Sequence, residues 1–242
     1  MKKLIALSLC SVLFLSCATS QINLNSVLNN LNGNGSQNNG SLTNQQMIDG
    51  LKEALNVGTN NATVTLNKTD GYFKNLAIKI LMPPEAVAVE NKLRSIGLGS
   101  KVDEAILSMN RAAELAAKDA APIFLDAIKT MTISDAASIV TGTDHAATDY
   151  LKSKTSTQLI SKFKPIISKA LSTVQATKYW SDVFTTYNKL PFVTKVNPDL
   201  TAYVTQKALD GLFYQIGLEE KKIRTDPAAQ ITTLLQQVFG KH

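Results

Sequence analysis

Three glutamates have side chains suited to catalysis: Glu53, Glu114 and Glu220. Two carboxyl groups with separated pKa values can hydrolyse a glycosidic bond without histidine or metal, and cell-wall glycans offer such bonds. Their neighbours favour a structural role, because Arg111 precedes Glu114 by three residues and Arg224 follows Glu220 by four. These are the spacings of ion pairs on one helix, so we expect surface ion pairs or buried polar ties between helices.

A polar phrase within an alanine-rich segment is the main candidate for a polar network or a binding site. In Asn110-Arg111-Ala112-Ala113-Glu114, the small alanines allow a second helix to come close, and buried polar side chains then need partners. We predict that Arg111 pairs with an acid of residues 219–226. The full candidate set is Asn110, Arg111, Glu114, Glu220, Arg224 and Asp226.

Histidine, cysteine and nucleotide chemistry have little support in the sequence. His242 is terminal, and His145 follows Asp144 in the first turn of an expected helix, where the positive end of the helix dipole disfavours an imidazolium. No Gly-x-Ser-x-Gly, His-Glu-x-x-His or Walker motif occurs, and no cysteine follows Cys17. We therefore predict no catalytic residue, no metal ligand and no cofactor.

The first residues are typical of an export signal. Two lysines precede an apolar run at residues 4–15, which is too short to span a bilayer comfortably. The phrase Leu15-Ser16-Cys17-Ala18 resembles a bacterial lipobox, in which the cysteine takes a diacylglycerol and becomes the new N-terminus. We expect a signal peptide at residues 1–16 and a lipid anchor on Cys17 that holds the protein on a membrane.

The residue after Cys17 bears on localisation. Ala18 is not acidic, and the resemblance to lipoproteins with such a second residue implies the periplasmic face of the outer membrane. The alternative is ordinary cleavage after Ala18-Thr19-Ser20, which would release a soluble periplasmic protein.

A polar linker is expected after the anchor. No charged residue occurs from Ala18 to Ile48, and residues 17–41 are rich in Asn, Gln, Ser and Gly, a composition that favours a disordered tether. Without residues 1–16 the chain has 23 Lys and Arg against 19 Asp and Glu, a net charge of +4. Because this is mild and both signs alternate along the chain, we do not expect a nucleic acid partner.

Residues 42–242 indicate one all-α domain, an irregular packing of about eight to ten helices. At most a short extended segment or ribbon is expected near residues 62–81. In the first half we predict helices at 44–57 (capping box Thr43/Gln46, end near Gly58), 84–96 (closed by Gly97), from Ser100 with Asp103 as its cap pair, and 122–131. In the second half we predict helices from Thr132 with Asp135 to Gly142, at 144–152, 156–173 (kinked at Pro165), 176–189, from Asn197 to Gly217, 219–224, and from Asp226 to Phe239.

Five phrases taken together carry a family resemblance. They are Gly50-Leu51-Lys52-Glu53-Ala54-Leu55, Asp70-Gly71-Tyr72-Phe73, Met109-Asn110-Arg111-Ala112-Ala113-Glu114, Asp210-Gly211-Leu212-Phe213 and Glu219-Glu220-Lys221-Lys222-Ile223-Arg224-Thr225-Asp226-Pro227. The chain resembles the domain of unknown function 4197 family over roughly residues 42–240. This resemblance implies an exported bacterial helical protein with no established activity, so it assigns no catalytic residue.

Aromatic side chains gather in the last third of the chain and could line a cleft, although a role in the core is favoured. They are Tyr179, Trp180, Phe184, Tyr187, Phe192, Tyr203, Phe213 and Tyr214. The function expected from the sequence is a tethered helical binding or scaffolding module in the periplasm, with an apolar ligand or an envelope protein as its partner. The alternative is a carboxylate-based hydrolase of cell-wall glycans.

Overall fold

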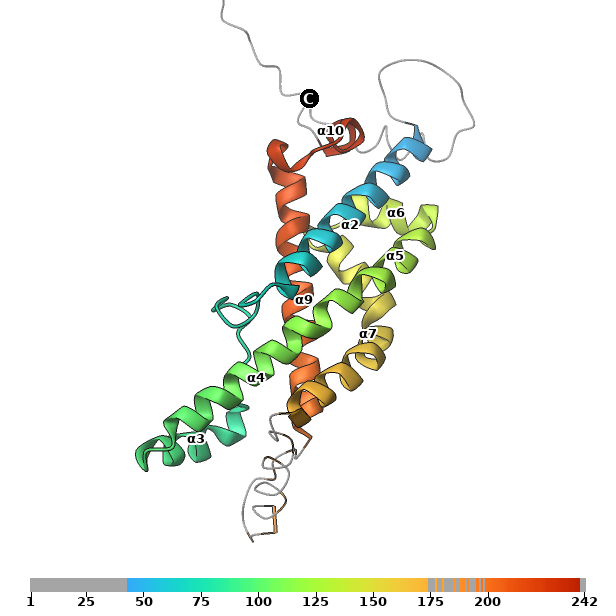
Figure 1. The fold of residues 1–242 in the computed structure, drawn as a ribbon. Coiled ribbons are helices and arrows are strands. Elements are labelled where there is room, and N and C mark those ends of the chain that lie inside the picture. Colours follow the sequence, from blue (N-terminus) through green and yellow to red (C-terminus); the bar gives the residue numbers. More distant parts are fainter. Residues whose placement is uncertain are drawn as a thin grey trace, which may run out of the picture. The chain divides into compact units, whose positions relative to one another are not determined.

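A computed structural model describes residues 43–173 and 199–239, together with residues 177, 180, 185, 188, 189, 191, 195 and 197 between them. All of them belong to the compact unit Ser36–Gly240. Figure 1 shows that the described residues form helices joined by turns. No strand occurs in this part of the chain, and the predicted all-α fold is confirmed.

The described helices are distributed over both halves of the domain. The first half contains α2 (Asn44–Asn67), η1 (Pro84–Ala86), α3 (Val87–Ser95), α4 (Gly99–Ala117), η2 (Lys118–Ala120) and α5 (Ala121–Lys129). The second half contains α6 (Ile133–Val140), α7 (Ala146–Thr173), α9 (Leu200–Thr225), η3 (Pro227–Ala229) and α10 (Thr233–Phe239). None of these helices is both long and apolar enough to cross a membrane.

Helices α4 and α9 hold the core together, since α9 packs against α7, α2 and α4, and α4 also packs against α7 and α2 (Figure 1). The core between them is apolar, and its largest fully buried side chains include Tyr72, Phe124, Phe163, Met109 and Leu159. Helix α3 buries none of its residues, and among the described elements it packs mainly on α4 and η1.

Two glycines expected to end helices lie within them instead. Helix α2 continues past Gly58 to Asn67, so residues 62–66 are helical. A Cβ at Gly58 would lie 3.6 Å from Ile223, which shows that this glycine lies where α2 meets α9. Helix α9 likewise continues through Gly217, which lies beside His145. Packing between helices, rather than helix termination, explains both glycines.

Helix starts were predicted correctly where the signal is a local hydrogen-bond pair. Thr43 and Gln46 form a capping box at α2, and Thr132 and Asp135 form one at α6. The cap predicted at Ser100 is wrong, because α4 begins at Gly99 without a side-chain cap. Asp103 pairs instead with Arg94 of α3 at 2.7 Å. Its carboxylate is used by an ion pair rather than by a helix terminus.

Helix α7 is one continuous element from Ala146 to Thr173, so the break expected after Lys152 is absent. Pro165 lies inside it, and the kink predicted there stays a prediction. Helix α9 begins at Leu200 with Asp199 as its N-cap, rather than with Asn197, whose side chain accepts from the Asp199 N–H at 2.9 Å. The helix expected at 176–189 lies outside the continuously described residues.

Candidate functional site

The loop between α2 and η1, residues 68–83, is fixed to the helices by a buried tyrosine. The Tyr72 side chain is fully buried, and its hydroxyl donates a hydrogen bond of 2.7 Å to the carbonyl of Ala208 in α9. A Cβ at Gly211 would lie only 2.5 Å from the Tyr72 ring, so glycine is needed where the ring meets α9. Burial raises the pKa of Tyr72 far above the usual range.

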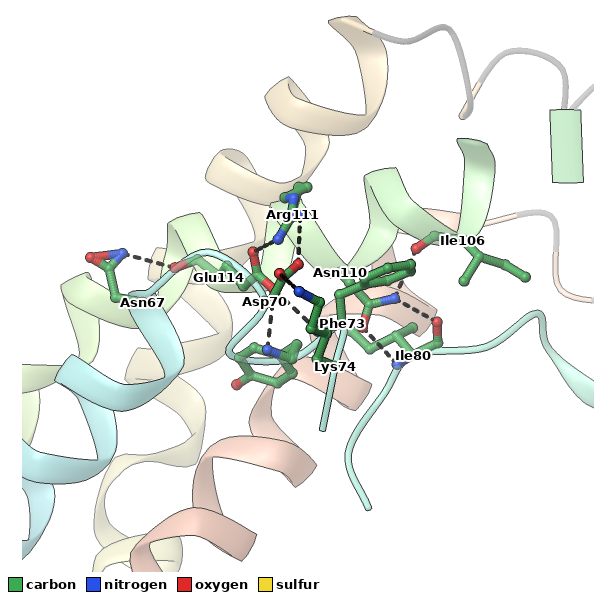
Figure 2. Close-up of polar contacts among 10 residues, drawn as sticks. Asn67, Asp70, Phe73, Lys74, Ile80, Ile106, Asn110, Arg111 and Glu114 are labelled. Atoms are coloured by element: carbon green, nitrogen blue, oxygen red, sulfur yellow. Dashed lines mark hydrogen bonds and ion pairs between the residues drawn. The ribbon is translucent and has the colours of Figure 1, made fainter. Parts of the chain in front are cut away.

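The side chain of Glu114 binds the backbone of the same loop. Its Oε1 accepts from the backbone N–H groups of Tyr72 and Phe73, each at 3.1 Å. Its Oε2 accepts from Arg111 at 2.6 Å, and the Glu114 side chain is only 5 % exposed. Both carboxylate oxygens therefore have partners within the fold, and Figure 2 shows the cluster that they form.

Arg111 joins the loop to α4 through a second acid. It donates to Asp70 at 2.7 Å, while Lys74 pairs with the other oxygen of the same carboxylate at 2.8 Å. The pKa of Asp70 is held below its ordinary value by hydrogen bonds, chiefly from Lys74 and next from Arg111. The pKa of Arg111 is raised by hydrogen bonds to acids, chiefly to Glu114 and next to Asp70. Asp70 has φ +71°, a left-handed conformation that aspartate tolerates better than most residues.

Asn110 fixes the far end of the loop. Its side-chain Oδ1 accepts from the N–H of Ile80 at 2.9 Å, and its Nδ2 donates to the carbonyl of Ile80 at 2.8 Å (Figure 2). The same Nδ2 donates to Ile106 of α4 at 2.8 Å. A fully buried amide thus pairs with both backbone groups of one loop residue, as a neighbouring strand would.

Glu220 binds backbone N–H groups of α7, as Glu114 binds those of the loop. Its carboxylate accepts from the N–H groups of Ala147 and Thr148 at 3.1 and 2.9 Å, in the first turn of α7. It also accepts from the Thr148 hydroxyl at 2.7 Å and pairs with Arg224 at 2.9 Å. Arg224 donates further to the carbonyl of Ile139 in α6. A negative charge at the N-terminus of a helix is favourable, so this pair joins α6, α7 and α9.

The candidate residues therefore fall into two clusters. The ion pairs expected from spacing, Arg111 with Glu114 and Glu220 with Arg224, are both present. The partner predicted for Arg111 in residues 219–226 is wrong, because Asp70 of the folded-back loop takes that place. Asp226 joins neither cluster and instead accepts from the N–H of Ala228, at the start of η3.

The glutamates are poorly placed for hydrolysis. Glu114 and Glu220 have side chains that are 5 % and 6 % exposed, and every carboxylate oxygen accepts hydrogen bonds from the fold. Glu53 is only half-buried, on α2. Within the described part of the chain, no group of three or more His, Cys, Asp or Glu side chains could hold a metal ion. Both polar clusters are accounted for by the contacts that tie the helices and the loop together.

A groove of about 910 Å³ lies between η1, α3 and α4, with Trp180 and the ends of α7 and α9 completing it. Of the eighteen described residues that line it, fourteen are apolar: Met82, Ala86, Val89, Leu93, Leu98, Val102, Ala105, Leu107, Met109, Ala112, Leu115, Ala170, Trp180 and Leu200. The other four all come from α4 and follow one edge at helical spacing: Lys101, Glu104, Ser108 and Arg111. The groove thus has an apolar floor and one polar edge.

Of the late aromatic residues that the structure describes, Trp180 lines the groove. Phe213 instead packs edge to face against Phe124 in the core, with ring centroids 6.1 Å apart. Tyr203 donates to the carbonyl of Leu81, and Tyr214 is 46 % exposed. Tyr179, Phe184, Tyr187 and Phe192 lie outside the described residues.

The model of one protein family, described as a protein of unknown function (DUF4197), matches residues 41–240. The chain belongs to the DUF4197 family. A search of curated proteins and a search of solved structures found no match. In this DUF4197 protein, three of the phrases that carried the resemblance meet at one place: Asp70–Phe73 lies on Asn110–Glu114 and against Gly211. Together these phrases hold the loop 68–83 against α4 and α9. No single stretch of sequence reveals this contact.

Proposed function

We propose that this DUF4197 protein is an exported binding module that holds an elongated, largely apolar small molecule, of the chemical type of a fatty acyl chain, in the groove between α3 and α4. The observation that carries the proposal is the groove itself. Its volume of about 910 Å³ lies within the roughly 300–1,000 Å³ that small-molecule sites occupy. Its lining is mainly apolar with a few polar groups along one edge, which is the composition of small-molecule sites.

The extent of the groove supports an elongated ligand. Its lining follows α4 from Leu98 to Leu115, a length of about 25 Å at 1.5 Å per residue. Leu98 and Leu115 are also 44 % and 53 % exposed, so the rim itself is apolar. Val89 and Leu93 of α3 line the opposite wall without being buried. A hydrocarbon chain between these walls would bury apolar side chains that the fold leaves open.

A polar head group has a place along the edge of α4. Lys101 and Glu104 pair with each other at 2.9 Å, and both are more than half exposed, so their mutual attraction is weak. Arg111 is held by two acids but is 38 % exposed and keeps further N–H donors. An amphiphile can therefore lie with its chain on the apolar floor and its head group against this edge.

The alternative function, hydrolysis of cell-wall glycans, has less support. Glycosidases need two accessible carboxyl groups on opposite sides of the scissile bond. Glu114 and Glu220 are both buried and committed to backbone N–H groups. Their role in joining helices accounts for their position without a reaction.

Export and anchoring complete the proposal and rest on the first residues. The lysine-led apolar run and the phrase around Cys17 support lipidation and attachment to the periplasmic face of the outer membrane, with a soluble periplasmic protein as the alternative. The test is the intact mass of the protein from the membrane fraction, beside Cys17→Ala. A lipid-sized mass that Cys17→Ala lacks supports the anchor, whereas an unmodified chain that begins near Gln21 contradicts it.

Ligand binding is tested with a chain-length series. Saturated fatty acids and the matching alcohols are titrated into the purified protein by calorimetry. Each buried methylene contributes about 0.8 kcal/mol, so affinity should rise about fourfold per carbon and then level off when the groove is full. An affinity that is independent of chain length would contradict the proposal, and binding of the acids but not the alcohols would show that the head group dominates.

A pair of tryptophan variants, one inside the groove and one outside it, tests the position of the ligand. Ala105 lines the groove and is half-buried, whereas Ala88 on α3 is exposed and does not line it. Ala105→Trp should abolish the chain-length dependence, and Ala88→Trp should leave it unchanged. Thermal unfolding of both variants shows whether either has lost its fold. Equal loss of binding in two folded variants would show that the ligand binds outside the groove.

A further inference from the structure

The most exposed large apolar side chain in the described part of the molecule lies in a firmly anchored loop. Leu76 is 90 % exposed, at the tip of the loop 68–83. On one side Tyr72 is fully buried, and on the other Ile80 is 1 % exposed and bound by Asn110. The fold thus holds both sides of a turn whose tip presents a leucine to water.

The turn itself is braced by its own hydrogen bonds. The N–H of Asn75 donates to the carbonyl of Tyr72 at 3.1 Å, and the N–H of Ile78 donates to the carbonyl of Asn75 at 3.1 Å. The Asn75 side chain also accepts from the N–H of Ala77 at 3.2 Å. Little further ordering is needed when Leu76 binds a surface, so less of the binding free energy is lost to entropy.

The charges of the loop are positive around this apolar tip. The loop has three lysines, Lys68, Lys74 and Lys79, and one acid, Asp70, which pairs with Lys74 and Arg111. Within the described residues Lys68 and Lys79 form no ion pair, and Lys79 lies over the ring of Phe73 at 4.2 Å. The tip therefore combines one leucine with lysines on both sides of it in sequence.

We propose that the loop 68–83 is a membrane-contacting element, in which Leu76 enters the head-group boundary of an anionic bilayer and Lys68, Lys74 and Lys79 lie at its phosphates. An apolar side chain with flanking lysines is the combination that binds such an interface, because lysine keeps its amine in the polar layer while its stem lies along apolar surface. Each lysine near an anionic surface strengthens binding about fivefold. The proposal stands independently of the groove ligand, although the loop leads into the groove at Met82.

Local depth at position 76 is the direct test. The full chain carries only Cys10 and Cys17, so Cys10→Ser and Cys17→Ser with Leu76→Cys gives one site for an environment-sensitive fluorophore. Ile133→Cys is the matched control, because Ile133 is 61 % exposed on α6. The labelled proteins are mixed with vesicles of phosphatidylcholine, with and without phosphatidylglycerol. We expect a blue shift and loss of iodide quenching at position 76, only with phosphatidylglycerol, and no change at position 133.

Other outcomes would overturn the proposal. An unshifted label at position 76 shows that the loop stays in water, and equal shifts at both positions show adsorption without orientation. A shift without vesicles indicates contact between proteins, and an equal shift on pure phosphatidylcholine removes the role of charge. Lys68→Gln with Lys79→Gln should raise the phosphatidylglycerol fraction needed for half of the shift, and an unchanged fraction contradicts the assignment of those lysines.

Discussion

The ring of Tyr72 lies so close to Gly211 that any side chain at position 211 would overlap it. A Cβ there would be 2.5 Å from Cε1 of the ring and 3.2 Å from Cβ of Ile78. The loop and α9 can meet only because position 211 has no side chain, and the Tyr72 hydroxyl then reaches the carbonyl of Ala208.

Gly211→Ala is therefore expected to destabilise the protein, although alanine is a better helix former than glycine. Overpacking of a buried site costs about 1–3 kcal/mol, more than the roughly 0.5–1 kcal/mol that alanine adds to a helix. Gly58→Ala is the control, because the added Cβ would lie at an ordinary 3.6 Å from its neighbours. Urea unfolding should show a less stable Gly211→Ala and a slightly more stable Gly58→Ala, and the same sign for both would contradict the argument.

Glu220→Gln should weaken the join between α9 and α7. The amide keeps the shape but loses the charge opposite Arg224, whose side chain is 16 % exposed, and loses one acceptor for the N–H groups of α7. Removal of one member of a buried ion pair costs about 3–5 kcal/mol. Glu219→Gln changes the neighbouring residue, whose contact with Asn61 is exposed, and should stay within about 0.5 kcal/mol in denaturant unfolding.

Acid should remove the contribution of Asp70. Its pKa lies below the ordinary 3.8, because Lys74 and then Arg111 donate hydrogen bonds to the carboxylate. The stabilisation is complete above the unfolded pKa and is lost as pH falls through the lower folded value. The difference in stability between wild type and Asp70→Asn, measured by urea unfolding from about pH 5 to about pH 2.5, should shrink. A constant difference would show that the charge of Asp70 does not matter.

Alkali should act through Tyr72. Burial raises the pKa of this phenol, so the folded protein keeps it neutral while the unfolded chain ionises near its ordinary value of 10.0. The stability from this group is full below that pH and falls as pH rises above it. Tyr72→Phe should flatten the loss of stability above about pH 10. Tyr214→Phe changes an exposed tyrosine and should leave the curve of the wild type intact.

The sequence predicts those features whose partners lie within one helical turn. The capping boxes at Thr43 and Thr132 and the two ion pairs involve residues three or four apart, so their spacing is visible in the chain. The backbone groups that the glutamates bind are not visible in this way. Tyr72 lies 42 residues from Glu114, and no local pattern specifies such a contact.

The glycines show the same limit. Gly97 has φ +83° and ends the segment of α3, as a glycine after a helix predicts. Gly58 is a glycine too, but it lies within α2 at the contact with α9, which depends on how two distant helices meet. The groove could likewise not be predicted from the sequence, because its walls come from η1, α3, α4, Trp180 and the ends of two further helices.

Helix α3 buries no residue and, among the described elements, packs mainly on α4 and η1, so it can open locally. Its opening exposes little that the core needs, so its amides should exchange with deuterium far faster than those of α9, through a partial opening rather than global unfolding. A ligand that fills the groove would bind only the closed form and would slow that exchange. The protection of α3 then reports occupancy of the groove in the intact protein.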